Sequence, residues 1–333
     1  MCSSVAQLVE QVAVNHWVAG SSPARGAMKS YLYCFVSFCK DAMTHPSILD
    51  GISAAQNSFT HVLLDIYGVL HEGGNAFAHA IQCLERLKAA GKKVYLFSNA
   101  PRLAARIERT LEAQGVSRIL YETIFSSGQH VRYCFETNDP AHTSLGKHYY
   151  HIGYPEHILL ENTPSSLNLK PCNAIKDADF ILLTAPFKAH DTAEQYDATL
   201  DEIRVKNLTV VCANADPYVI FKGEKLVCGG TLAENYVRKG GRVLWHGKPH
   251  TPFYKWALDQ IDAPPKNVLC IGDSMWTDIK GATDAGLACA LIVETSVHQA
   301  FFRETQKSFE QTLQDFLTSF SCVPTYALKR FEW

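Results

Sequence analysis

From Asn57 onward the chain alternates short apolar runs with segments of helical periodicity, and this alternation is the strongest constraint on its fold. The run "HVLLDI" at residues 61–66 precedes a helical pattern at 76–93, and "VYLFSN" at 94–99 precedes another at 101–115. Such repetition is typical of βαβ units, in which helices cover a sheet of parallel strands. Because the runs are apolar at nearly every position, both faces of the sheet are predicted to be buried.

A second series of the same kind closes the chain. It runs from "RVLWHG" through a helix with Thr251 as its N-cap, then "NVLCIGD", a helix from Thr277 to Gly286 and "LACALIVE". The residues between the two series have strands and helices of their own. The predicted fold class is therefore α/β, a Rossmann-like parallel-sheet core with an inserted α/β domain. The predicted parts are a leader at 1–42, a core made of 43–127 and 241–333, and the inserted domain at 128–240.

Charge and cysteine content restrict the partners and the compartment. Lys and Arg total 31 and Asp and Glu total 33, a net charge of -2 at pH 7, whereas nucleic acids and anionic membranes attract basic surfaces. We therefore expect a small-molecule partner, no nucleic acid and no membrane. The 11 cysteines are scattered and form no CxxC pair, which argues against a disulfide framework and a thiolate zinc site and favours the reducing cytoplasm.

The two ends of the chain give separate predictions. Residues 29–43 hold a lysine and a short apolar stretch that is too short to span a bilayer and lacks a small-x-small cleavage site. We expect the true start at Met28 or Met43. At the other end a helix is predicted near 306–319. The tail beyond it is expected to pack through Tyr326, Phe331 and Trp333. These residues would contact either the core or a second subunit, and the second case would give a homodimer.

Polar residues stand at or just beyond the ends of four predicted strands. Ligands of open parallel α/β sheets bind at the carboxyl ends of the strands, so one pocket would collect these side chains. Taken singly, a strand-end Asp is a turn former, Ser98 a helix cap and Lys248 a solvated cation. Their joint occurrence beside glycines and turns favours a functional site instead. The residues are Asp65, Ser98, Asn99, Lys248, Asp273 and Asp278.

Four stretches carry a resemblance to a known family. In chain order, "DIYGVL", "LFSNA", "GKP" and "GDSMWTDIKGATDAG" resemble the four motifs of the haloacid dehalogenase superfamily of phosphohydrolases. The resemblance covers roughly residues 58–295. The insertion between the second and third motifs resembles the C2-type cap of the class IIA branch, which includes phosphatases of the p-nitrophenyl phosphate, pyridoxal phosphate and nucleotide type. Within it Asn214 and Asp216 stand where the branch has its Asn-x-Asp element.

The resemblance implies a nucleophile and a metal site. Asp65 would attack a small phosphorylated metabolite and form an aspartyl phosphate, which divides hydrolysis into two steps. Mg²⁺ prefers oxygen ligands and would be held by Asp65, Asp273 and the backbone carbonyl of Tyr67. Asp278 would orient Asp273 or a metal-bound water.

The resemblance also implies how the phosphate is bound. Ser98, Asn99 and neighbouring backbone N–H groups would bind the transferring oxygens, and Lys248 would supply the positive charge that holds nucleophile and phosphoryl group together. Asn214 and Asp216 would contribute to substrate binding from the cap.

Tyr67 departs from the family pattern, because phosphatases of this superfamily usually carry a second Asp at that position. That Asp protonates the leaving group and then activates water. A phenol with a reference pKa of about 10 can donate a proton but is almost never a base at pH 7. His71 and Glu72, just beyond the turn, are alternative bases. General acid–base help is typically worth about 10²- to 10⁴-fold, so its loss predicts a slow enzyme that still binds metal and phosphate.

Three functions are consistent with these residues. The first is an Mg²⁺-dependent phosphatase, a phosphoric monoester hydrolase slowed by Tyr67. The second is a catalytically impaired protein that binds a phosphorylated metabolite or regulates another process. The third is a different reaction at the same nucleophile, such as dehalogenation or phosphonate cleavage; the Mg²⁺ ligands and the class IIA cap speak against dehalogenation. We expect the first.

Overall fold

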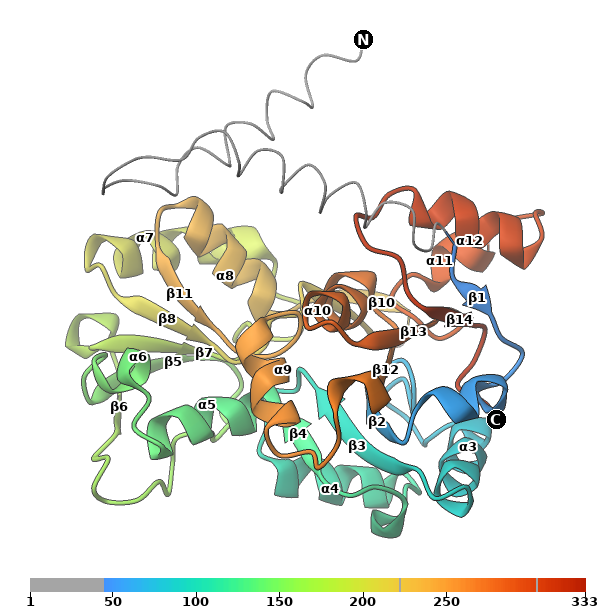
Figure 1. Ribbon diagram of the computed structural model, residues 1–333. Helices are drawn as coiled ribbons and strands as arrows, with labels where there is room; N and C mark the ends of the chain where they lie inside the picture. Colours follow the sequence, from blue (N-terminus) through green and yellow to red (C-terminus); the bar gives the residue numbers. More distant parts are fainter. Residues whose placement is uncertain (1–44, 222, 304) are drawn as a thin grey trace, which may run out of the picture. The chain divides into compact units, whose positions relative to one another are not determined.

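The structure, a computed structural model, describes residues 45–221, 223–303 and 305–333 (Figure 1). The leader predicted at 1–42 and both predicted start positions lie outside the described residues. Within the described part, no helix has the length and apolar character needed to cross a bilayer. The described strands form a seven-stranded sheet, a five-stranded sheet and a two-stranded hairpin.

The seven-stranded sheet is parallel throughout, with strand order β1-β14-β13-β12-β2-β3-β4. Its central strands β2 and β12 are buried at every position, as their apolar sequences require. The predicted fold class, α/β with a Rossmann-like parallel sheet, is confirmed. The strands are β1 (Ser47–Ile48), β2 (His61–Leu64), β3 (Lys93–Ser98), β4 (Ile124–Ser126), β12 (Val268–Gly272), β13 (Ala288–Ile292) and β14 (Tyr326–Leu328).

Helices cover both faces of this sheet, because successive side chains of a strand point to opposite sides. In β2, Leu64 joins a buried cluster with α3 and α4, whereas Leu63 joins a second cluster with α9, α10 and α12 (Figure 1). The helical elements are α3 (Ala78–Ala89), α4 (Ala104–Ala113), α9 (Thr251–Leu258), α10 (Lys280–Asp284), α11 (Gln299–Arg303), α12 (Phe309–Leu317) and the short turns η1 (Ile52–Ser58), η2 (Arg118–Leu120), η5 (Pro265–Asn267) and η6 (Met275–Ile279).

Two helix starts differ from the prediction. The helix expected from Thr277 begins earlier, because the Ser274 hydroxyl accepts a hydrogen bond from the backbone N–H of Thr277 and caps the π-helical turn η6, which α10 then continues. Helix α9 includes Thr251 as its first residue, and His250 occupies the N-cap without a side-chain hydrogen bond.

The five-stranded sheet is also parallel, with strand order β11-β8-β7-β5-β6. One buried cluster joins it to α7 and α8, and another joins it to α5. The elements are β5 (His148–Ile152), β6 (Lys170–Cys172), β7 (Phe180–Leu183), β8 (Thr209–Cys212), β11 (Arg242–Trp245), the hairpin β9 (Tyr218–Phe221) and β10 (Glu224–Val227), α5 (Ser127–Glu136), α6 (Pro140–Thr143), α7 (Asp197–Val205), α8 (Gly229–Arg238), η3 (Ile175–Asp177) and η4 (Ala193–Tyr196).

The run "RVLWHG" was assigned to the wrong sheet. We expected it in the core, but β11 pairs in register with β8, so that Arg242 lies beside Thr209 and Trp245 beside Cys212. The side chains of Val243 and Trp245 pack on the cluster formed with α7 and α8. An apolar run fits either sheet equally well, and the sequence pattern could not distinguish them. The chain returns to the seven-stranded sheet after Trp245, and the domain boundary predicted between 240 and 241 must move accordingly.

The C-terminal tail packs on the seven-stranded sheet. Strand β14 lies between β13 and β1, and Phe331 is buried in the cluster with α3 and α4. Trp333 packs against the same cluster, and a Cβ atom at Gly51 would lie 2.4 Å from its carbonyl oxygen. Of the two expectations for the tail, packing onto the core is the one observed.

Candidate active site

The site lies where β2, β3 and β12 end side by side. Leu64 pairs with Leu96 of β3 and with Ile271 of β12, and the backbone N–H of Asp65 continues the ladder with a 2.8 Å bond to the carbonyl of Ile271. Asp65 and Asp273 therefore leave adjacent strand ends, as the strand-end argument predicts.

Lys248 is the cation of the site and is almost fully buried, with 2% of its surface exposed. Its Nζ lies 2.8 Å from Oδ1 of Asp65 and 2.8 Å from Oδ1 of Asp278, and it donates a 3.1 Å hydrogen bond to the Phe97 carbonyl. Burial alone would lower the pKa of Lys248, but the carboxylates, led by Asp278 and Asp65, outweigh it and raise the pKa above its ordinary value. The ammonium therefore stays charged.

Three buried carboxylates meet beside this ammonium. Oxygens of Asp65, Asp273 and Asp278 all lie within 4.8 Å of one another. Burial, and then Asp278, raise the pKa of Asp65 to about 7 despite the opposing effect of Lys248. Burial and Asp65 raise the pKa of Asp273 well above its usual range. One ammonium does not neutralise three carboxylates, and a hard divalent cation such as Mg²⁺ fits both the charge and the oxygen donors.

The oxygens of these carboxylates differ in availability. Asp278 accepts from Lys248 at Oδ1 and from the Ser274 N–H at Oδ2, at 2.8 and 3.2 Å. Asp65 uses Oδ1 for Lys248 and for the Ile66 N–H. Asp273 accepts from the Val297 N–H at Oδ2, 2.9 Å away. Both oxygens of Asp278 are thus engaged, whereas Asp65 and Asp273 each keep one oxygen that accepts no hydrogen bond from the described residues.

Gly68 allows the chain to turn immediately after the nucleophile position. Its φ is 81°, in the left-handed region that favours glycine. A Cβ atom there would lie 2.4 Å from Oδ2 of Asp273. Its N–H donates to the His71 carbonyl at 2.8 Å, and the Thr295 hydroxyl donates to its carbonyl. The residue at position 68 therefore has to be glycine for Asp273 to come this close.

The phenol of Tyr67 is committed to the hairpin. Its Oη donates a 2.8 Å hydrogen bond to the carbonyl of Ile220 in β9, and its ring lies edge-on to His71 with ring centroids 5.5 Å apart. Burial, and then the carboxylates of Glu72 and Asp273, raise the pKa of Tyr67 to about 12. The expected role of this phenol as a proton donor therefore competes with a hydrogen bond already made.

The two alternative bases are placed differently. His71 lines the cavity, and its Nδ1 accepts a 2.9 Å hydrogen bond from the Gly73 N–H, so the neutral ring carries its proton on Nε2. Burial lowers the pKa of His71 to about 4. In this arrangement His71 can donate a hydrogen bond but has no free nitrogen to accept a proton. Glu72 is not among the cavity-lining residues and meets Gln299 at 3.4 Å.

Asn99 holds the Lys248 segment in place. Its Oδ1 accepts from the Lys248 N–H at 2.6 Å, and its Nδ2 donates to the Lys248 carbonyl at 2.9 Å and to Oδ1 of Asp216 at 2.8 Å. Gly247 permits this approach, since a Cβ atom there would lie 2.3 Å from Oδ1 of Asn99. Asn214 in turn accepts from the Asp216 N–H at 3.0 Å. Asn99 thus holds the backbone of Lys248 directly, and the Asn-x-Asp element supports Asn99 through Asp216.

A cavity of about 400 Å³ opens above these residues. Ser98, buried at its wall, accepts from the Ala100 N–H at 3.2 Å, and its own O–H meets no acceptor among the described residues. Lys248 and Asp278 lie behind the wall. The predicted residues that line the cavity are Asp65, Tyr67, Ser98, Asn99, Asn214, Asp216 and Asp273.

Sequence reasoning missed several other lining residues. Arg102 follows Ser98 by four positions in the same loop, and that proximity was a usable signal. Other missed residues lie in the segments after β5 and β7, in the hairpin and in η6. They include Tyr154, His157, Thr184, Tyr218 and Trp276. Trp276 stands inside the fourth motif stretch, but the resemblance assigns it no role.

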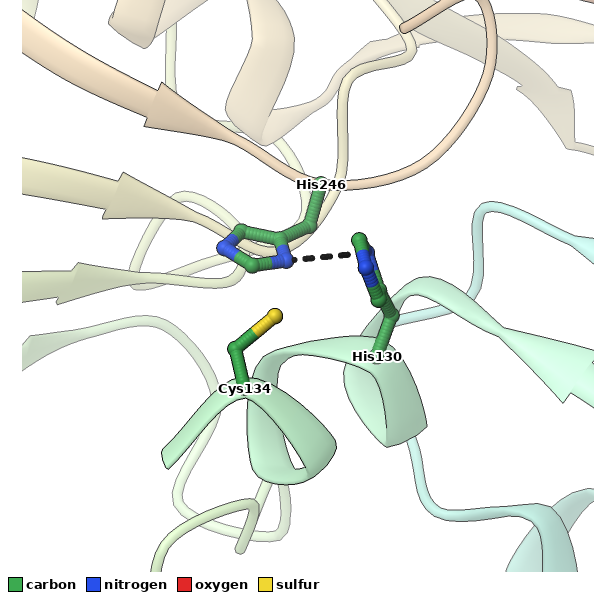
Figure 2. Close-up of side chains that lie close together, drawn as sticks. All are labelled: His130, Cys134 and His246. Carbon is green, nitrogen blue, oxygen red and sulfur yellow. Dashed lines mark hydrogen bonds between the residues drawn. The ribbon is translucent and has the colours of Figure 1, made fainter. Parts of the chain in front are cut away.

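A second group of buried side chains of metal-ligand type lies outside the cavity. Figure 2 shows His130 and Cys134 on α5 facing His246, with their ligand atoms within 4.8 Å of one another. Nδ1 of His246 lies 3.1 Å from Nδ1 of His130, Nε2 of His246 lies 2.9 Å from Nε2 of His142, and Nδ1 of His142 lies 2.6 Å from Asp139. One proton in each gap satisfies the chain with neutral imidazoles. Both nitrogens of His246 are thereby used, and the cluster ties α5 to the segment after β11.

Comparisons with known proteins agree with this geometry. A haloacid dehalogenase-like hydrolase family model matches residues 62–158, and a HAD-hydrolase-like model matches residues 245–316. The curated phospholysine phosphohistidine inorganic pyrophosphate phosphatase of Xenopus laevis is 26% identical over 253 residues, which cover 72% of this chain and 86% of that protein.

Solved structures show the same architecture. A haloacid dehalogenase-like hydrolase from Brucella suis is 26% identical, with a TM-score of 0.71 over 85% of this chain and 99% of that chain. A glycerol phosphate phosphatase from Mycobacterium tuberculosis, solved with magnesium, is 20% identical and has a TM-score of 0.57 over 84% of this chain and 77% of that chain. The family matches, the fold and the curated relative together show that the chain belongs to the haloacid dehalogenase superfamily, among the class IIA phosphatases that hydrolyse phosphoric monoesters.

Proposed function

We propose that the chain is an Mg²⁺-dependent phosphatase that transfers a phosphoryl group from a small phosphorylated metabolite to Asp65 and then to water. The observation that carries this proposal is the placement of Asp65 at the cavity wall, 2.8 Å from the buried ammonium of Lys248 and next to Asp273. The magnesium complex of the mycobacterial glycerol phosphate phosphatase and the phosphorylated substrates in the name of the frog relative support it.

The first half-reaction follows from the residues present. Asp65 attacks phosphorus through a carboxylate oxygen and the leaving group departs in line. Lys248 opposes the rise in the pKa of Asp65, which favours the ionised carboxylate, and attracts the transferring oxygens. The Ser98 hydroxyl, which donates to no group in the described part of the chain, donates to one of these oxygens. Asp65, Asp273 and the Tyr67 carbonyl would hold Mg²⁺, which would reduce the repulsion between the carboxylate and the phosphate.

The second half-reaction lacks an evident base. Hydrolysis of the aspartyl phosphate needs a group that takes a proton from water. The Tyr67 hydroxyl donates to Ile220, and the acceptor nitrogen of His71 is occupied by Gly73. We therefore propose a slow enzyme that accumulates aspartyl phosphate. The same observation favours a second candidate, a protein that binds a phosphorylated metabolite and no longer turns it over.

The wider setting is also a proposal. Residues 128–245 would form a cap that closes over the cavity, with β11 as its last strand. We place the protein in the cytoplasm, because all the cysteines that the structure describes are free and a reducing compartment keeps thiols free. A homodimer stays open, through a surface other than the buried part of the tail.

The test is a panel of phosphorylated metabolites with Mg²⁺, run on the wild type and on Asp65→Asn. The proposal expects activity that a chelator removes, its loss in Asp65→Asn with an unchanged circular dichroism spectrum, and thermal protection of the wild type by beryllium fluoride with Mg²⁺. Full activity in Asp65→Asn refutes the covalent route. Binding of several phosphate esters without cleavage of any of them supports the second candidate.

A further inference from the structure

A second group of polar side chains lines the same cavity and takes no part in the chemistry proposed above. Arg102 comes from the loop after β3, His157 from the segment after β5, and Thr184 directly follows β7. They are positioned by separate elements of the two sheets. Their shared location on one cavity suggests that they contact what the cavity binds.

His157 presents a polar atom that the protein leaves unsatisfied. The residue is buried, with 4% of its surface exposed, and its Nε2 has no hydrogen-bond partner among the described residues. Its Nδ1 lies 3.1 Å from the Thr184 hydroxyl, which lies 2.8 Å from Nε2 of His151 and 3.4 Å from the Ile152 carbonyl. The single Thr184 proton can go to the Ile152 carbonyl at 3.4 Å or to His157 Nδ1 at 3.1 Å, and the shorter distance favours His157. With Thr184 donating to Nδ1, the neutral His157 ring carries its proton on Nε2. That N–H is the donor without an acceptor.

Arg102 presents a charge that the protein leaves unpaired. Arg102 lines the cavity and, within the described ranges, its side chain forms no ion pair and no hydrogen bond. Burial and then the neighbouring Arg106 lower the pKa of Arg102, and Glu156 opposes them. An arginine stays charged at any pH the protein meets and offers a fork of donors that matches carboxylate and phosphate oxygens. Burial, and then the charges of Arg102 and His151, lower the pKa of His157 to about 3, so the ring is neutral.

We propose that Arg102 and His157 bind a second anionic group of the substrate, so that the preferred phosphoric monoester carries a carboxylate or a further phosphate. This inference rests on the proposed function for the position of the first phosphate, at Asp65 and Ser98. The cavity of about 400 Å³ holds both ends of a short carbon chain. Its aromatic and apolar walls, which include Tyr218, Trp276 and Val297, suit the carbons between them.

Non-hydrolysable ligands test the inference without any dependence on turnover. Propylphosphonate and 3-phosphonopropionate differ by one carboxylate in place of a methyl group, and ethane-1,2-diphosphonate replaces that carboxylate by a second phosphonate. Calorimetry on the full chain with Mg²⁺ is expected to show that 3-phosphonopropionate or ethane-1,2-diphosphonate binds at least about 10-fold more tightly than propylphosphonate. A factor of this size corresponds to one charge-assisted hydrogen bond.

Two variants locate the effect. Arg102→Gln is expected to remove the preference, whereas Arg106→Gln, a neighbouring exposed arginine that does not line the cavity, keeps it. The ratio of kcat/KM for 3-phosphoglycerate over glycerol 3-phosphate should fall in the same Arg102 variant. Equal binding of the three phosphonates by the wild type, or a preference that survives in Arg102→Gln, overturns the inference.

The outcomes separate this inference from the proposed function. Ester hydrolysis with no preference among the phosphonates leaves the phosphatase in place and removes the anion subsite. A preference that Arg102→Gln abolishes, in a protein that cleaves no ester, supports the subsite and refutes the phosphatase. A wild type that binds none of the three ligands at millimolar concentration overturns the subsite.

Discussion

Replacing Tyr67 by Phe and by Asp tests what limits the reaction: the phenol hydroxyl, or the lack of a carboxylate at position 67. Tyr67→Phe removes the 2.8 Å hydrogen bond to the Ile220 carbonyl and keeps the ring that lies against His71. Tyr67→Asp restores the carboxylate that phosphatases of this superfamily usually carry there. The two changes therefore separate the contribution of the hydroxyl from that of the missing base.

The structure sets the size of each effect. One neutral hydrogen bond contributes about 0.5 to 1.5 kcal/mol net, so Tyr67→Phe should lower the free energy of unfolding by about 1 kcal/mol. p-Nitrophenolate is a good leaving group that hardly needs an acid, so its release in the first turnover should stay within about threefold of the wild type. A carboxylate at 67 can take a proton from water, so Tyr67→Asp should speed breakdown of the aspartyl phosphate about 10-fold or more.

Rapid mixing of p-nitrophenyl phosphate with enzyme and Mg²⁺ measures both steps. The wild type and Tyr67→Phe should release a burst of p-nitrophenolate before a slow steady state, and Tyr67→Asp should raise the steady-state rate. A burst rate reduced about 100-fold in Tyr67→Phe would show that the phenol is the acid after all. If Tyr67→Asp changes nothing while His71→Ala or Glu72→Gln abolishes turnover, the base lies beyond the turn and our reasoning is wrong.

Three further predictions follow from the site and its surroundings. Asp273→Asn should raise the Mg²⁺ concentration for half-maximal activity more than Asp278→Asn, because both Asp278 oxygens already accept protein hydrogen bonds; the reverse order contradicts the metal assignment. Gly68→Ala should abolish activity, because its Cβ would collide with Asp273. Gly91→Ala is the control: its φ is 71° but the space around it is open, so it shares the backbone strain and should keep its activity. Burial holds the pKa of His130 at about 4, below the unfolded value of 6.5, so its contribution to stability is full above pH 6.5 and is lost as the pH falls towards 4, by about 1.4 kcal/mol per unit. Urea unfolding at pH 7 and pH 5 should show a smaller loss in His130→Gln than in the wild type.

The parts of the site that the sequence predicts share one physical cause. Carboxyl ends of parallel strands meet at one edge, so residues that directly follow apolar runs come together whatever lies between them in the chain. Asp65, Ser98 and Asp273 obey this rule. Lys248 reaches the same place by another route, because β11 lies in the five-stranded sheet and the chain crosses back after Trp245. Its position beside Asp65 agrees with the motif resemblance, whereas the strand assignment that preceded it is wrong.

Contacts between distant side chains were not predictable in the same way. The bond from Tyr67 to Ile220 spans 153 positions and that from Asn99 to Asp216 spans 117. Each depends on how the hairpin and the five-stranded sheet lie over the strand ends, and hydrophobic periodicity carries no information on that placement. The same holds for His157, whose role depends on an atom with no partner, a property that exists only once the surrounding chain is folded.

These contacts make the charge balance at Asp65 depend on both sheets. The ammonium that opposes its burial comes from the segment after β11, and Asn99 at the end of β3 clasps the backbone of that segment on both sides. Without the two hydrogen bonds from Asn99, Lys248 can leave its place 2.8 Å from Asp65. Burial already raises the pKa of Asp65, and loss of the nearby ammonium would raise it further. We therefore propose that Asn99 affects catalysis by fixing the position of Lys248. On this proposal, Asp65 is a competent nucleophile only while the segment after β11 holds Lys248 beside it.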